Sequence, residues 1–194
     1  MGEPHGCRRC LFVASQFGIK TERIDLEAVC GKFIEVLPLG NKLASANLKP
    51  RLRMLTLYYY ANNLNYLVAG TGNKSELMVG YFTKYGDGGV DILPIGGLVK
   101  AKVRELAGEL GIPKEIIDKP PSAGLWDGQT DEEEIGITYE DLDKGILALE
   151  SGSPGTGMTK NQAHMVIDSH ILSKVENLIK VSAHKRTLPQ IFES

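Results

Sequence analysis

Helical patterns alternate along this chain with short apolar runs typical of buried strands, and this alternation limits the possible folds more than any other feature. The clearest apolar run is 66–69, which leads into a Gly-Thr-Gly turn. Shorter extended segments are predicted at 21–26 and 91–94. Alternating strands and helices favour an α/β fold, with a Rossmann-like parallel sheet flanked by helices.

Apolar residues at helical spacing predict the helices between these runs. The expected ranges are 10–17, 27–37, 48–63, a short helix after residue 72, 99–110, 139–149 and 159–182. In the 99–110 helix, one apolar stripe is followed by Gly111 and Pro113, which are typical of a helix end. Pro50 fits the 48–63 helix only in its first turn, where no backbone N–H is needed.

Composition excludes several classes of protein. The 194 residues suit one domain with its own core, and a formal net charge of −2 gives no reason to expect nucleic-acid binding. No apolar run approaches the length of a membrane span. The apolar stretch after Arg8 and Arg9 is too short for a signal peptide, so a cytoplasmic protein is expected.

The chain has three cysteines, an odd number that argues against a disulfide framework. Cys7-x-x-Cys10 matches half of a metal site. A structural zinc site needs further ligands, and the sequence holds no second paired motif. Ordinary thiols are therefore favoured over a metal site.

Parallel sheets bind ligands beyond the carboxyl ends of their strands, which directs attention to the segment 70–76. Its glycines let the backbone approach a ligand, and the N–H groups of a following helix can bind an anion. Thr71 has a hydroxyl suited to phosphate or ribose, and Glu76 has the hard oxygens that Mg²⁺ prefers. The alternative is a plain turn.

Three other segments have both a functional and an ordinary interpretation. The stretch 80–91 is either a loop around a polar ligand or a hairpin with a turn at Asp87-Gly88. The long loop 120–136 is either a mobile lid or a linker, and its acidic run 131–134 is typical of a solvated face. The basic stretch 49–53 is either a solvated helix face or an anion site.

Taken together, these segments resemble the ammonia-dependent NAD synthetases, of the ATP-pyrophosphatase group with an adenine-nucleotide α-hydrolase-like fold. The resemblance runs from about Gly18 to the end of a single domain, 1–194, in which 1–17 is an atypical start. The matching strings, in order, are NLKPRLRM (47–54), GTGNKSE (70–76), GYFTKYGDGG (80–89), KPPSAGLW (119–126) and HKR (184–186).

The resemblance implies a ligase that amidates deamido-NAD with ammonia through an adenylated intermediate, giving NAD, AMP and pyrophosphate. ATP would be the co-substrate, Mg²⁺ the metal and a homodimer the assembly, with 48–63 at the dimer interface. The implied roles are ATP binding by Thr71, Lys100 and Ser122; Mg²⁺ binding by Glu76; and deamido-NAD binding by Arg51, Lys84, Asp91, His184 and Lys185. The 120–136 loop resembles a family lid that excludes water from the reacting atoms.

One family feature has no counterpart here. The Ser-Gly-Gly-x-Asp-Ser loop, which in the family binds the ATP pyrophosphate, does not occur in the sequence, and the chain is interpreted as starting after it. Two alternatives therefore stay open beside the active ligase. One is a non-catalytic homologue that binds dinucleotide or dimerises. The other is the C-terminal part of a glutamine-dependent NAD synthetase.

Overall fold

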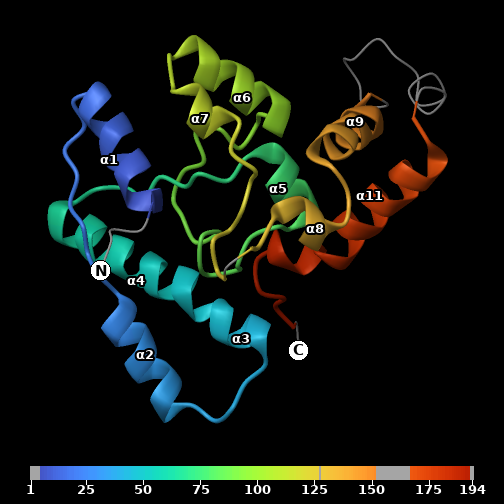
Figure 1. Cartoon of the computed structure of the whole chain (residues 1–194). Coiled ribbons are helices and arrows are strands. Elements are labelled where there is room, and N and C mark those ends of the chain that lie inside the picture. The colour runs from blue at the N-terminus through green and yellow to red at the C-terminus, as the bar shows by residue number, and fades with distance from the viewer. Residues whose placement is uncertain (1–4, 127, 152–166, 193–194) are drawn as a thin grey trace.

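Helices dominate the computed structural model, which describes residues 5–126, 128–151 and 167–192 (Figure 1). The helices are α1 (His5–Gln16), α2 (Glu27–Val36), α3 (Lys42–Ala46), α4 (Leu48–Leu64), α5 (Lys74–Val79), α6 (Lys100–Glu109), α7 (Lys114–Ile117), α8 (Asp131–Ile135), α9 (Tyr139–Glu150), α11 (Ser169–Val181) and the 3-10 helix η1 (Ala183–Lys185).

The helices predicted from periodicity are confirmed in α2, α4, α5, α6 and α9. Pro50 is the third residue of α4, within the first turn as required. Helix α1 begins five residues earlier than expected and ends before Gly18, whose φ of 63° is the left-handed conformation that glycine adopts easily. The helix expected at 159–182 is seen as α11 from Ser169; its first part, up to residue 166, lies outside the described residues.

The strand predictions agree less well with the structure than the helix predictions. The segment 21–26 is not a strand, and that prediction is wrong. The segments 66–69 and 91–94 meet in a single parallel bridge between Ala69 and Ile92. Around it, the amide N of Gly70 donates to the carbonyl O of Ile92 at 2.8 Å.

No longer strand occurs in the part of the chain that the structure describes, so the expected sheet is not confirmed. Two extended segments that pair only with each other gain little stability, because a stable sheet needs three or more strands or a helix packed on its face. The described residues give neither segment of the bridge a third extended neighbour.

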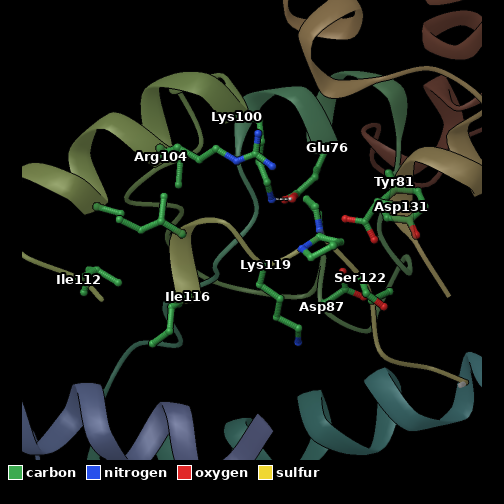
Figure 2. Close-up of a pocket in the computed structure, with 16 residues that line it drawn as sticks. Glu76, Tyr81, Asp87, Lys100, Arg104, Ile112, Ile116, Lys119, Ser122 and Asp131 are labelled. Carbon is green, nitrogen blue, oxygen red and sulfur yellow. Dashed lines mark hydrogen bonds and ion pairs between the residues drawn. The ribbon is translucent and has the colours of Figure 1, made fainter. Parts of the chain in front are cut away.

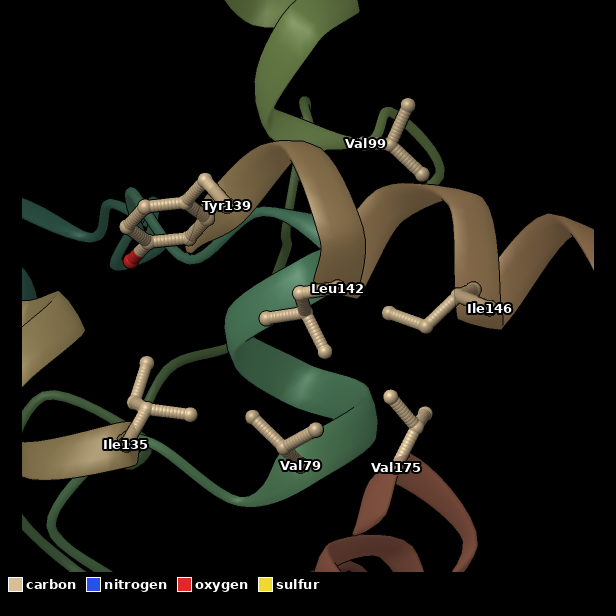
Figure 3. Packing of buried hydrophobic residues seen from close by; sticks show 7 residues of the cluster. All are labelled: Val79, Val99, Ile135, Tyr139, Leu142, Ile146 and Val175. Atoms are coloured by element: carbon tan, nitrogen blue, oxygen red, sulfur yellow. The ribbon is translucent and has the colours of Figure 1, made fainter. Parts of the chain in front are cut away.

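The main core joins α5, α9 and α11, with α9 packed on both of the others (Figure 3). Leu142, Ile146 and Val175 are completely buried at its centre. Gly145 allows the close approach of α11, because a Cβ at this position would lie 2.8 Å from Val175 Cγ2. The core thus fixes the start of α9 against α5, where polar side chains gather.

The N-terminal helices are packed differently. Helices α1 and α2 lie on the opposite side of the molecule from α9 and α11 (Figure 1). Helix α2 has no buried side chain, and α4 buries only Pro50, Leu52 and Ala61. Among the described residues, no helix is both long and apolar enough to cross a membrane.

Candidate active site

The start of α5 is held by a reciprocal cap. The Asn73 side chain accepts a hydrogen bond from the Glu76 amide N at 3.0 Å, and Glu76 Oε2 accepts one from the Asn73 amide N at 3.0 Å. The other carboxylate oxygen, Oε1, accepts from Lys100 Nζ at 3.0 Å. Glu76 is therefore fixed by its own helix and paired with α6.

A buried polar network below this pair ties three helices together. The Ser75 hydroxyl donates to Asp143 Oδ1 on α9, and Asp143 Oδ2 accepts from the Ala101 amide N at 2.8 Å. The Lys100 amide N donates to Ser75 Oγ at 2.9 Å. Ser75 and Ala101 neighbour Glu76 and Lys100 in sequence, so Asp143 positions both members of the ion pair.

The Glu76–Lys100 pair forms one wall of a cavity of about 430 Å³, which we name the α6 pocket (Figure 2). Its other polar lining residues come from the C-terminal half of the chain and from the glycine-rich loop; they are Tyr81, Asp87, Arg104, Lys119, Ser122 and Asp131. Cations and carboxylates thus face the same cavity, as a site for a metal-bound polyanion requires.

Two tyrosines meet the acidic run of α8 at the edge of this pocket. The Tyr139 hydroxyl donates to Asp131 Oδ2 at 3.0 Å and lies 3.4 Å from Glu76 Oε1. The Tyr81 hydroxyl donates to Glu134 Oε2 at 2.6 Å. Burial, together with the nearby carboxylates, raises the pKa of both tyrosines, so each hydroxyl keeps its proton and acts as a donor.

A second and larger cavity, of about 800 Å³, lies beside α4 and is named the α4 pocket. Basic side chains from distant parts of the sequence line it: Arg51, Arg53, Lys84, His184 and Lys185. Arg51 and Arg53 are exposed, and within the described ranges neither side chain forms a hydrogen bond or an ion pair. Such a set suits an anionic ligand with several phosphates.

Two lysines of the α4 pocket tie the C-terminal segment to the 80–84 segment. Lys84 Nζ donates to the carbonyl oxygens of His184 and Thr187. Lys185 Nζ donates to the carbonyl oxygens of Gly80 at 2.7 Å and Phe82 at 2.9 Å. Burial lowers the pKa of Lys185 below its usual value.

The two pockets adjoin. Tyr81, Asp87 and Ala123 line both, so the two cavities share a boundary. The loop that carries Ala123 is held from outside, because Lys49 Nζ donates to the Leu125 carbonyl O at 2.6 Å and Lys42 Nζ lies 4.1 Å from the centre of the Trp126 ring. These contacts fix the loop over the junction.

Most of the predicted site residues line one of the two pockets, although the residues predicted to bind one ligand do not all line the same pocket. Lys100, Ser122 and Glu76 share the α6 pocket, whereas Thr71 lines the α4 pocket. Asp91 is not among the lining residues of either pocket. Its carboxylate accepts from Tyr58 Oη at 2.9 Å and from the Val68 amide N at 2.7 Å, beside the parallel bridge.

Several residues of the site were missed by sequence reasoning. Asp131 belongs to a run expected on a solvated face, yet it is 4% exposed. Tyr139 and Asp143 lie one helical turn apart on α9, a spacing that by itself is common in core helices. Only the meeting of α9 with α5 and α6 gives them a place in the site.

The chemistry of the α6 pocket fits a magnesium ion bound together with phosphates, because Mg²⁺ takes one or two carboxylates and otherwise waters and phosphate oxygens. Glu76 and Asp131 offer such oxygens. The described residues contain no group of three or more acidic, histidine or cysteine side chains able to hold a metal. Cys10 is exposed, and the Cys7 side chain is not among those that the structure describes.

Comparison with known proteins gives a consistent result. The NAD synthase family matches residues 1–189, so the match begins before Gly18, where the resemblance was expected to start. The "NH(3)-dependent NAD(+) synthetase" of Archaeoglobus fulgidus is 49% identical over 92% of this chain and 68% of its own length. The chain spans 55–68% of the length of the first three curated relatives.

Solved structures agree on the fold. An NMN synthetase from Francisella tularensis has a TM-score of 0.82 and 34% identity, covering 97% of this chain and 73% of that one. An NH3-dependent NAD synthetase from Campylobacter jejuni has a TM-score of 0.80 and 26% identity, covering 100% and 74%. The helical body described above is therefore similar to that of α/β enzymes of this kind.

Proposed function

Because this chain belongs to the NAD synthase family, we propose that it amidates deamido-NAD with ammonia, using ATP and releasing AMP and pyrophosphate. The observation that carries the proposal is the junction of the two pockets through Tyr81, Asp87 and Ala123. One pocket suits a metal-bound nucleotide and the other an anionic dinucleotide. The reacting groups of the two ligands would meet between them.

A carboxylate is a poor electrophile, so the nicotinate carboxylate must be activated before ammonia can attack it. The nicotinate carboxylate attacks the α-phosphorus of ATP, and the bond to pyrophosphate breaks. Ammonia then attacks the acyl carbon, AMP leaves, and the nitrogen loses a proton to a base or to water. The chain contributes mainly by holding both anions in register and by neutralising their charge.

In this scheme the α6 pocket takes ATP. Lys100 and Ser122 contact its phosphates, and Thr71 reaches it from the adjoining pocket. Glu76 would hold Mg²⁺, which would neutralise phosphate charge. Lys100 is paired with Glu76 in the structure, so it is already oriented toward this position.

In the same scheme the α4 pocket takes deamido-NAD. Arg51, Lys84, His184 and Lys185 line that pocket, and the arginine and the two lysines would supply positive charge to the dinucleotide. Asp91 would act at its rim, on a sugar hydroxyl. The loop 120–136 serves as a lid, and its anchors at Lys42 and Lys49 connect it to the start of α4.

A second copy of the chain is part of the proposal. The exposed apolar side chains of α4, including Leu55 and Leu57, form a surface that a homodimer would cover. Light scattering of the purified chain at several concentrations tests this point. A cytoplasmic location stays a prediction.

The decisive assay measures NAD formation from deamido-NAD, ATP and ammonium. We expect turnover with ammonium, and Lys100→Ala to lower kcat about 10²- to 10³-fold, the usual loss for a group that stabilises developing charge. Lys102→Ala is the matched control, because Lys102 is exposed on the same helix and pairs with Glu105. Absence of turnover at high enzyme concentration contradicts catalysis by this chain.

Two further arms separate the alternatives. Calorimetry with deamido-NAD alone detects a chain that binds without turnover, as a non-catalytic homologue would. Replacing ammonium by glutamine tests the other nitrogen source, and replacing deamido-NAD by nicotinate mononucleotide tests the activity that the name of the Francisella structure suggests. We expect deamido-NAD and ammonium to be preferred, as the curated relatives' names indicate.

A further inference from the structure

One buried oxygen in the α6 pocket has no partner. Asp131 is 4% exposed, and its Oδ2 accepts from the Tyr139 hydroxyl at 3.0 Å. Its other carboxylate oxygen, Oδ1, forms no hydrogen bond in the structure. Buried polar atoms are rarely left unpaired, and each one that is requires an explanation, of which a bound ion or water is one.

The backbone does not explain why this carboxylate is buried. Asp131 is the first residue of α8, but the helix is capped by the preceding Thr130, whose side chain accepts from the Glu133 amide N. The Asp131 amide N donates to the Pro121 carbonyl O at 3.0 Å, which ties the start of α8 to the loop carrying Ser122. The side chain is thereby held inside the pocket rather than in water.

Glu76 and Asp131 face the same cavity from α5 and α8 (Figure 2). The Tyr139 hydroxyl lies between them, bonded to Asp131 Oδ2 and 3.4 Å from Glu76 Oε1. A hydroxyl has one proton, and Tyr139 donates it to Oδ2, so Asp131 Oδ1 is left without a donor. Lys100 neutralises Glu76, while Asp131 has no ion-pair partner among the described residues.

We propose that Asp131 Oδ1 is a second carboxylate ligand for the divalent cation of this pocket, opposite Glu76. Two carboxylates with water and phosphate oxygens make up the usual magnesium environment, and a hard cation removes the cost of the unpaired oxygen. The inference rests on the proposed function for the identity of the pocket. It adds that the loop carrying Ser122 is fastened to the metal through α8.

The test measures metal binding directly, independently of turnover. Mn²⁺ is titrated into the full chain with a non-hydrolysable ATP analogue, and bound Mn²⁺ is followed by electron paramagnetic resonance. We expect Asp131→Asn to weaken Mn²⁺ binding about 10- to 100-fold, as removal of a charged contact does. Glu133→Gln removes one charge from an exposed position of the same helix, so it should leave the affinity within about twofold.

Thermal unfolding without metal shows whether the variant is folded. Asn keeps an acceptor for Tyr139 and avoids an uncompensated buried charge, so Asp131→Asn should melt at or above the wild-type temperature while gaining less from added Mg²⁺. A purely structural Asp131 would give the reverse, a lower melting temperature with the metal-induced gain intact.

Glu76→Gln separates this proposal from the proposed function. If Glu76→Gln weakens Mn²⁺ binding and Asp131→Asn does not, Asp131 is no ligand, while the proposed function stands. If the wild-type chain binds no Mn²⁺ even with the nucleotide analogue, the pocket holds no metal and both proposals are overturned. If ammonium competes with Mn²⁺ at equal concentration, the site takes a monovalent cation and the proposal of a divalent ligand fails.

Discussion

The two ends of this chain use the same kind of sequence pattern with opposite results. Helices α9 and α11 place their apolar stripes in a closed core, where Leu142 and Val175 are inaccessible to water. Helix α2 has an apolar stripe as well, yet none of its side chains is buried, and Val29 and Phe33 are about half exposed. Periodicity therefore fixes where helices form, whereas burial depends on which partners reach them.

The sharpest test of this contrast is a pair of identical substitutions. Leu142→Ala leaves a cavity in the core and should lower the free energy of unfolding by about 2–5 kcal/mol. Leu39→Ala, at a fully exposed position between α2 and α3, should change it by less than about 0.5 kcal/mol. Urea unfolding followed by circular dichroism measures both. Equal losses would mean that the N-terminal helices are covered in solution, for example by a second copy.

A polar pair gives the next largest difference. Asp143→Ala leaves the Ser75 hydroxyl and the Ala101 amide N buried without an acceptor. It should lower the free energy of unfolding by about 2–4 kcal/mol. Asp25→Ala removes a similar bond, from the Glu27 amide N, in an exposed setting and should cost about 0.5–1 kcal/mol. The same unfolding experiment applies. A loss at position 143 no larger than that at 25 would refute a closed polar network below the site.

Helix caps distinguish the two regions more finely. Asn73→Ala breaks the reciprocal cap of α5 and should cost about 1–2 kcal/mol, because Asn73 is almost fully buried. Asn41→Ala removes the exposed cap of α3 and should cost only about 0.5–1 kcal/mol. Thermal melts rank the two variants. Asn73→Ala should also lower kcat, since Glu76 loses its anchor, whereas a kcat close to that of the wild type would argue against this positioning.

The smallest effect concerns pH. Burial raises the pKa of Asp131 above its ordinary value of 3.8, so the folded chain disfavours the charged form. This carboxylate therefore destabilises the metal-free protein at neutral pH, and the destabilisation disappears as the pH falls through its raised pKa. Asp131→Asn should be more stable than the wild type at pH 7, with a gap that closes in acid. A gap independent of pH would show that charge is not the cause.

Sequence reasoning reached the helices and the general location of the site, because both depend on local patterns and ordered strings. The segment 70–76 did enter a helix, and Glu76 and Lys100 did meet. It failed at the sheet, since the apolar run 66–69 does not specify which neighbours pair with it. It also failed within the acidic run, where only the direction of α8 separates buried Asp131 from exposed Glu133.

Lys185 is held by two carbonyl oxygens of the 80–82 segment, which has one further consequence. An ammonium group has three protons, and two of them already bind the carbonyl oxygens of Gly80 and Phe82. An incoming phosphate would therefore meet one proton in a fixed direction. Freezing a lysine side chain costs about 1.5–2 kcal/mol of rotamer entropy, and folding has already frozen this one. Affinity at this point then depends on how well the ligand's angle of approach matches that proton.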